Sequence, residues 1–161
     1  MSEMVSKNFS LHEVVRSNTA ARKNIINKPT QQIIINATVT AQLGLQPFRE
    51  HTGLPVNPTS WFRNPQLNAA VGGVPHSLHQ TGFGVDFQVN GMTVDEVLAL
   101  LKKRKDIIQY DKAILERFQN KSTGAWIEWT HFQMPRKMGD KCRYITGKLT
   151  GDRNNPTWTQ T

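Results

Sequence analysis

Cysteine is nearly absent from this sequence, because Cys142 is the only one among 161 residues. A single thiol cannot form a disulfide within the chain, and it cannot supply the several cysteines that many structural zinc sites use. Folding without disulfides suits the reducing environment of the cytosol. The sequence therefore excludes a disulfide-stabilised fold and a zinc site built from several cysteines.

Long apolar runs are also lacking. Residues 1–10 contain no apolar stretch like that of a signal peptide. No segment approaches the roughly 20 apolar residues that a membrane-spanning helix needs. We therefore expect a protein that is made in the cytoplasm without an export signal and that is not inserted into a membrane.

Acidic residues are outnumbered, with 12 Asp and Glu against 20 Lys and Arg and a formal net charge of +8 at pH 7. Such a balance favours polyanionic partners, which include nucleic acid, anionic lipid and the bacterial envelope, and charge alone does not choose among them. No nucleic-acid-binding motif is recognisable, so nucleic acid is not expected as the partner. The densest basic run, residues 102–105, follows a predicted helix and complements the negative end of its dipole.

The length, an apolar content of 37% and the lack of repeats indicate one globular domain. Helices are predicted at about 10–15, 30–51, 65–71 and 93–101. Strands are predicted at 56–62, 82–89, 107–115 and 126–134, with 143–146 pairing beside the last of them. Because helices come first and strands dominate later, we predict an α+β fold with an antiparallel sheet. The domain spans 1–161, with an ordered core at about 9–150 and a polar, loose tail after Gly151.

Local signals mark where several of these helices begin. The pairs Ser10–Glu13 and Thr93–Glu96 have the S/T-x-x-E spacing of a capping box. Thr30 is expected to cap the longest helical segment, and Pro47 is expected to kink or end it. These signals set the helix boundaries more firmly than the apolar pattern does.

The first stretch that can carry chemistry is residues 77–86. It places His79 in a loop before a strand and Asp86 inside that strand. Apolar and small or polar residues alternate along 82–89, which predicts a half-buried strand with Asp86 on the face opposite the apolar side chains.

The second stretch is residues 126–131, where Glu128 and His131 stand among bulky apolar residues. His79, Asp86 and His131 together form a three-ligand set that leaves the fourth position of a tetrahedral zinc ion open for water. A nearby carboxylate such as Glu128 can take a proton from that water. Glu128 and His131 are three residues apart, so a flat strand would aim them at opposite faces unless a twist, a bulge or a later strand start re-aims one.

These motifs resemble those of the zinc D-alanyl-D-alanine carboxypeptidases and dipeptidases, and especially the phage L-alanyl-D-glutamate endopeptidases. The S-x-H-x-x-G-x-A-x-D motif of that family matches 77–86, with Gly84 in place of alanine. Its E-x-x-H motif matches Glu128 and His131. Its S-G-Y-R segment matches 60–63, with Trp61 in place of glycine. Further similarity extends over roughly residues 9–146.

The resemblance implies a role for each matched residue. It implies zinc bound by His79, Asp86 and His131, with Glu128 as the general base. It implies that Arg63 stabilises the developing oxyanion. Ser77 is expected to hydrogen-bond the substrate, and Trp129 is expected to line the substrate groove. The implied fold is of the hedgehog and D-Ala-D-Ala-peptidase type, a small antiparallel sheet that carries the zinc site and is packed by N-terminal and crossover helices.

The function implied by the resemblance is hydrolysis of peptidoglycan stem peptides by a monomeric phage or prophage endolysin. Such a protein would be made in the host cytoplasm and would reach the cell wall through a holin. Two alternatives stay open. The chain can be a D-alanyl-D-alanine carboxypeptidase, or a non-catalytic virion or wall-binding protein with the same fold.

Overall fold

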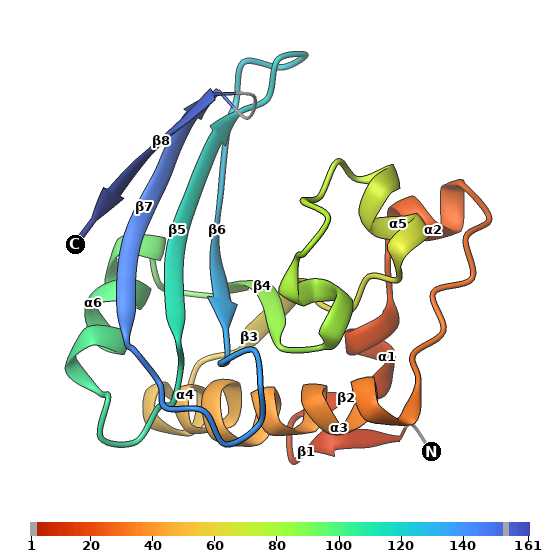
Figure 1. The fold of residues 1–161 in the computed structure, drawn as a ribbon. Helices are drawn as coiled ribbons and strands as arrows, with labels where there is room; N and C mark the ends of the chain where they lie inside the picture. Colours follow the sequence, from red (N-terminus) through yellow and green to blue (C-terminus); the bar gives the residue numbers. More distant parts are fainter. Residues whose placement is uncertain (1–2, 153–154) are drawn as a thin grey trace.

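The computed structural model describes residues 3–152 and 155–161 (Figure 1). Its helical elements are α1 (Leu11–Val15), α2 (Asn18–Arg22), α3 (Gln31–Thr40), η1 (Ala41–Leu45), α4 (Gln46–Thr52), α5 (Pro65–Ala70), η2 (Leu78–Thr81) and α6 (Val94–Lys103). Its strands are β1 (Met4–Ser6), β2 (Phe9–Ser10), β3 (Val56–Ser60), β4 (Gly84–Val89), β5 (Lys112–Gln119), β6 (Trp126–Gln133), β7 (Ile145–Asp152) and β8 (Asn155–Gln160). The mixed helix-and-strand composition agrees with the predicted class.

The main sheet of the described chain has six strands in the order β3-β4-β6-β5-β7-β8. Its neighbours pair antiparallel except β5 and β7, which run parallel. The predicted antiparallel arrangement therefore does not hold for one pair, β5 and β7. The predicted pairing of 143–146 beside β6 was wrong. The reason is that β4 and β5 already occupy both edges of β6, so the returning chain pairs with the free edge of β5.

The C-terminal segment is also ordered differently from expectation. We expected a loose tail after Gly151, but β8 pairs antiparallel with β7. The Thr161 backbone N–H also donates to the Thr146 carbonyl at 3.0 Å. Threonine and tryptophan favour extended backbone, and β7 offers an open edge of donors and acceptors. Residues 153–154 of the expected tail lie outside the described residues.

The capping predictions are confirmed. Both capping boxes form, at Ser10–Glu13 and at Thr93–Glu96, and the Thr30 side chain accepts from the Ile33 N–H. The strand expected at 107–115 instead begins at Lys112 and extends to Gln119.

The helical segment after Thr30 passes Pro47 through the π-helical turn η1. Proline has no N–H to bond the carbonyl four residues earlier, which is that of Leu43. That carbonyl instead accepts from the Gln109 backbone N–H at 2.9 Å. The chain therefore continues as α4, with Pro47 in its first turn. A contact from a distant loop satisfies the group that proline leaves unpaired.

Gly44 in this π turn lies against a core strand. A Cβ at this position would approach Phe132 Cε1 to 2.6 Å, and Phe132 is 1% exposed, so the ring has little room to move. We expect Gly44→Ala to lower the free energy of unfolding by about 1–3 kcal/mol, although alanine is the better helix former. Urea unfolding would measure this, with exposed Gln42→Ala as the control, expected within about 0.5 kcal/mol of wild type. A Gly44→Ala protein as stable as wild type would contradict it.

The two faces of the sheet have different roles. Phe87 and Phe132 on one face pack in the main core with Phe48 of α4, and their rings meet edge to face. The alternation predicted for 82–89 is confirmed, because Asp86 lies on the other face. That face is not open to solvent at this point, since the segment from 61 to 81 covers it (Figure 1). Asp86 is consequently only 9% exposed.

Candidate metal centre

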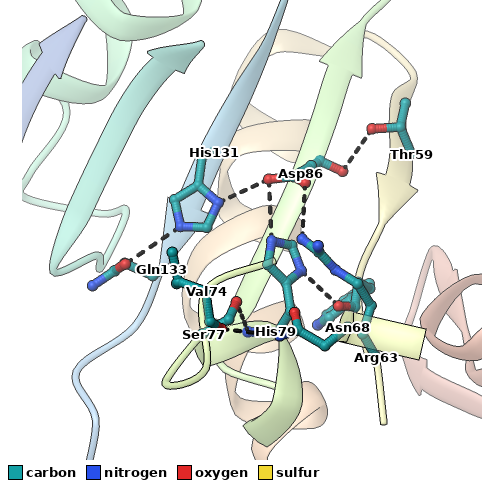
Figure 2. Close-up of polar contacts among 10 residues, drawn as sticks. Thr59, Arg63, Asn68, Val74, Ser77, His79, Asp86, His131 and Gln133 are labelled. Atoms are coloured by element: carbon teal, nitrogen blue, oxygen red, sulfur yellow. Dashed lines mark hydrogen bonds and ion pairs between the residues drawn. The ribbon is translucent and has the colours of Figure 1, made fainter. Parts of the chain in front are cut away.

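Three potential metal ligands converge from three elements, as Figure 2 shows. His79 comes from η2, Asp86 from β4 and His131 from β6. Asp86 and His131 are directly opposite in the antiparallel register of β4 and β6. One ligand atom from each of the three residues lies within 4.8 Å of the others. The structure thus brings together the three residues that the motifs single out.

Small residues let η2 approach β4 closely enough to place His79. Gly82 ends η2 with a positive φ of 83°. A Cβ at Gly84 would lie 2.9 Å from the His79 backbone nitrogen, a contact that even alanine would strain. Glycine at this position therefore suits this chain better than the alanine of the related motif. Ser77 contributes by accepting a hydrogen bond from the His79 N–H at 3.3 Å.

The ring of His79 is oriented by the residue that departs most from the family pattern. Trp61 is fully buried, and its carbonyl oxygen lies 2.7 Å from His79 Nδ1. A carbonyl only accepts, so Nδ1 carries the proton and Nε2 presents its lone pair. Burial lowers the pKa of His79 against the opposing pull of Asp86. A neutral imidazole with Nε2 facing inward is the form that binds zinc.

The Nε2 atom of His79 is the feature that most directly indicates a metal site. It is buried, lies 3.3 Å from Asp86 Oδ1 and has no hydrogen-bond partner among the described residues. Buried polar atoms without partners are rare in folded proteins. Two imidazole nitrogens and a carboxylate oxygen are a donor set that zinc prefers. The residues present therefore fit a zinc ion.

The ring of His131 is held from both sides. Its Nδ1 lies 2.8 Å from Asp86 Oδ1 and its Nε2 lies 3.3 Å from Gln133 Oε1. Burial acts to lower the pKa of His131, but the hydrogen bond and charge of Asp86 outweigh it, and the charge of Glu116 adds to them, so the pKa is raised. For Asp86, burial acts to raise the pKa, but the charges of the two imidazoles and the hydrogen bond from His131 hold it below its usual value.

Behind His131, a chain of polar contacts reaches the surface. Gln133 Nε2 donates to Asp111 Oδ2 at 3.4 Å. Asp111 is 3% exposed and accepts two hydrogen bonds from the Arg143 guanidinium, at 2.6 and 2.7 Å. The hydrogen bond from Arg143, opposed by partial burial, lowers the pKa of Asp111. The Asp111–Arg143 pair holds the Gln133 amide with its oxygen toward His131 Nε2, so that His131 Nδ1 is the nitrogen that faces Asp86.

We therefore expect Gln133→Leu to lower zinc affinity by about 10- to 100-fold, because the orienting acceptor for His131 Nε2 is lost. Competition with a chromophoric chelator would measure the affinity. Gln88→Leu, at an exposed position of β4, serves as the control and should bind zinc like wild type. A purely structural role for Gln133 would lower stability in urea and leave zinc affinity unchanged, which would contradict this assignment.

Arg63 lies at the metal site, as the resemblance implied. Its backbone N–H donates to the His79 carbonyl at 3.0 Å, and its guanidinium lies 3.5 Å from Asp86 Oδ2. The side chain is only 14% exposed. Arg63 therefore contacts the second oxygen of Asp86 and leaves Oδ1 to the two imidazoles, while adding positive charge beside the site.

Glu128 does not reach the site. The register of β5 and β6 runs without interruption from Gln119↔Trp126 to Lys112↔Gln133, so no bulge re-aims either residue. Strict alternation puts Glu128 on the face opposite His131. There its carboxylate pairs with Arg117 at 2.6 Å, and Arg117 in turn contacts Asp95 at the start of α6. The expected placement of Glu128 beside the metal is therefore wrong.

Glu116 is the carboxylate that shares a face with His131. The sequence motifs did not predict a role for it. On β5 it is opposite Trp129, while the next residue on this face, Ile114, is opposite His131. It lines the same cavity as the three ligands. Alternation along β5 would have identified it if the strand had been placed at 112–119 rather than 107–115.

The three ligands lie in a cavity of about 880 Å³, within the size range of small-molecule sites. Ser77 and Trp129, which the sequence predicts to contact substrate, both line this cavity. One wall is the sheet face that carries Glu116. The other is formed by the start of α2 and the loop after α5. The charged residues of the lining are three arginines, Arg16, Arg63 and Arg136, and two carboxylates, Asp86 and Glu116.

Comparison with known proteins bears on the whole site. A family model described as Peptidase M15 matches residues 7–117, which include Arg63, His79, Asp86 and Glu116. This confirms the family resemblance drawn from the motifs. No curated protein matches the chain. Within the described residues, no helix is both long and apolar enough to cross a membrane.

Proposed function

Because this chain belongs to the Peptidase M15 family, we propose that it is a zinc peptidase that hydrolyses stem peptides of bacterial peptidoglycan. The observation that carries the proposal is the convergence of His79 Nε2, Asp86 Oδ1 and His131 Nδ1 at one point of the cavity. Three ligands of this type leave zinc an open position for water and substrate, as in other catalytic zinc sites.

The chain's own residues supply the remaining steps of amide hydrolysis. A bound zinc ion would lower the pKa of water and polarise the scissile carbonyl. The Glu116 carboxylate accepts a proton from the attacking water and later donates it to the leaving amine. The Arg63 guanidinium, beside Asp86, stabilises the negative charge that develops on the carbonyl oxygen. Ser77 and Trp129 hold the substrate along the cavity.

The finer proposal is an L-alanyl-D-glutamate endopeptidase that acts as a phage or prophage endolysin, made in the host cytoplasm and released to the wall through a holin. Its support is the similarity to phage members over residues 9–146. The net charge of +8 would also keep the monomeric enzyme near an anionic envelope.

Digestion of purified peptidoglycan, followed by mass spectrometry of the muropeptides, tests this function. Products that end in L-alanine, with new D-glutamate amino termini, are expected for the endopeptidase. Release of terminal D-alanine would instead identify a carboxypeptidase. Zinc-loaded protein that binds the wall and cleaves no muropeptide would overturn the proposal in favour of a non-catalytic wall-binding protein.

A further inference from the structure

The sheet face that carries His131 continues beyond the metal centre as an apolar surface. Phe118 of β5, Trp129 of β6, Leu149 of β7 and Pro156 of β8 line the cavity there, and we call these four residues the apolar wall. The ring centroids of Phe118 and Trp129 lie 5.8 Å apart. Figure 1 shows β5 to β8 extending beyond β4, with α2 and α5 standing across from them. The metal centre and the apolar wall thus share one groove.

The spacing along β6 places this wall at a defined distance from the metal. Trp129 is two residues from His131 on the same face, which is about 7 Å at about 3.4 Å per residue. Ile127 is two residues further on, opposite Phe118, and is 42% exposed. A substrate group bound on the wall would therefore lie about 7–14 Å from the scissile bond.

We infer that the apolar wall binds the saccharide to which the stem peptide is attached, an inference that rests on the proposed function. Sugar rings present C–H groups on their faces, which stack on aromatic side chains, and hydroxyls at their edges. The facing wall supplies polar partners for those hydroxyls from Ser17, Asn18 and Thr19. One apolar wall and one polar wall match the two kinds of surface of a sugar.

The covalent geometry of the substrate fits this spacing. In an L-alanyl-D-glutamate bond, only the lactyl group and one alanine separate the sugar from the cleaved carbonyl. At about 3.6 Å for each unit this distance is about 7 Å, close to the separation of Trp129 from His131. The same wall would be too near the metal for the sugar of a chain that loses its terminal D-alanine, because the cleaved carbonyl is then three residues further along the stem.

Glu116 argues against a lipid or a protein as the occupant. Its carboxylate lies on the same strand face as Phe118 and two residues from it. An apolar partner that covered the wall would remove this charge from water, which is costly. A saccharide, with its hydroxyls and associated water, leaves the carboxylate hydrated.

Titration with an N-acetylglucosamine tetramer, which has no peptide to cleave, tests the wall directly. Calorimetry on the zinc-loaded and metal-free protein is expected to give similar dissociation constants. Trp129→Ala should raise the constant at least about tenfold. Leu149→Ser provides a second variant with a smaller change in volume, and circular dichroism verifies that both fold. Trp126→Ala is the matched control, because Trp126 is on the opposite face of the same strand and is 59% exposed.

A kinetic comparison completes the test. The disaccharide-linked tetrapeptide is expected to have a kcat/KM at least about tenfold above that of the sugar-free tetrapeptide, and Trp129→Ala should bring the ratio toward one. Equal kcat/KM values in wild type, or tetramer binding weakened equally by Trp126→Ala and Trp129→Ala, would overturn the inference. Cleavage of neither peptide would contradict the proposed function, and the tetramer titration would still decide the inference.

Discussion

Glu116→Gln is expected to lower kcat by roughly 10²–10⁴ while the protein still binds zinc, because the variant loses the group that takes the proton from water. Glutamine has nearly the same shape and keeps the hydrogen-bonding capacity, so the fold and the three metal ligands should be unchanged. The assay is muropeptide hydrolysis at saturating substrate, with zinc content measured by elemental analysis. A general base should affect kcat more than KM.

Glu128→Gln is the matched control for this prediction. Glu128 is on the adjacent strand of the same sheet but faces α6, where it pairs with Arg117. That pair is partly exposed, so its loss should cost at most about 1 kcal/mol of stability and leave turnover near wild type. If Glu128→Gln were inactive and Glu116→Gln fully active, the assignment made from the strand register would be wrong.

Removal of the metal is expected to have the other large effect. Treatment with a chelator should reduce peptidase activity to background, and added zinc should restore it. Because zinc binds the folded chain, zinc at 100 times its dissociation constant should stabilise that state by about 2.7 kcal/mol. For a chain of this size the midpoint of thermal unfolding should rise by about 5–10 °C. Differential scanning fluorimetry with and without zinc would measure this shift.

Ligand variants separate specific from incidental zinc binding. His79→Ala should abolish the zinc-dependent rise in Tm, because the buried Nε2 that faces Asp86 is lost. His51→Ala removes an exposed histidine outside the cavity and should retain the full shift. Full hydrolytic activity in the chelated protein, or an undiminished shift in His79→Ala, would contradict the proposed metal centre.

Much of the site could be predicted because its signals are local. The spacing within 77–86 reports a turn that places His79 next to a strand, and alternation places Asp86 away from the core. The capping boxes were also readable, since each involves side chains only three residues apart. Such features depend on steric and hydrogen-bonding rules that act within one turn or one strand.

The general base could not be assigned in this way. The E-x-x-H spacing predicted Glu128 as the general base. Only the uninterrupted pairing of β5 with β6 shows on which face of the sheet each residue lies. A bulge of one residue would have reversed the outcome. The choice between Glu116 and Glu128 is thus a property of strand register, which depends on residues far apart in the chain.

By itself, the sequence determined the ligand types, the helix starts and the alternation that separates a core face from a site face, because these follow from periodicity and short-range bonding. Only the tertiary structure decided that β7 joins β5 in parallel, that residues 155–160 form a strand, and that Glu116 shares a face with His131. These features depend on which strand edges are left free when the sheet assembles, and no local stretch of residues encodes that.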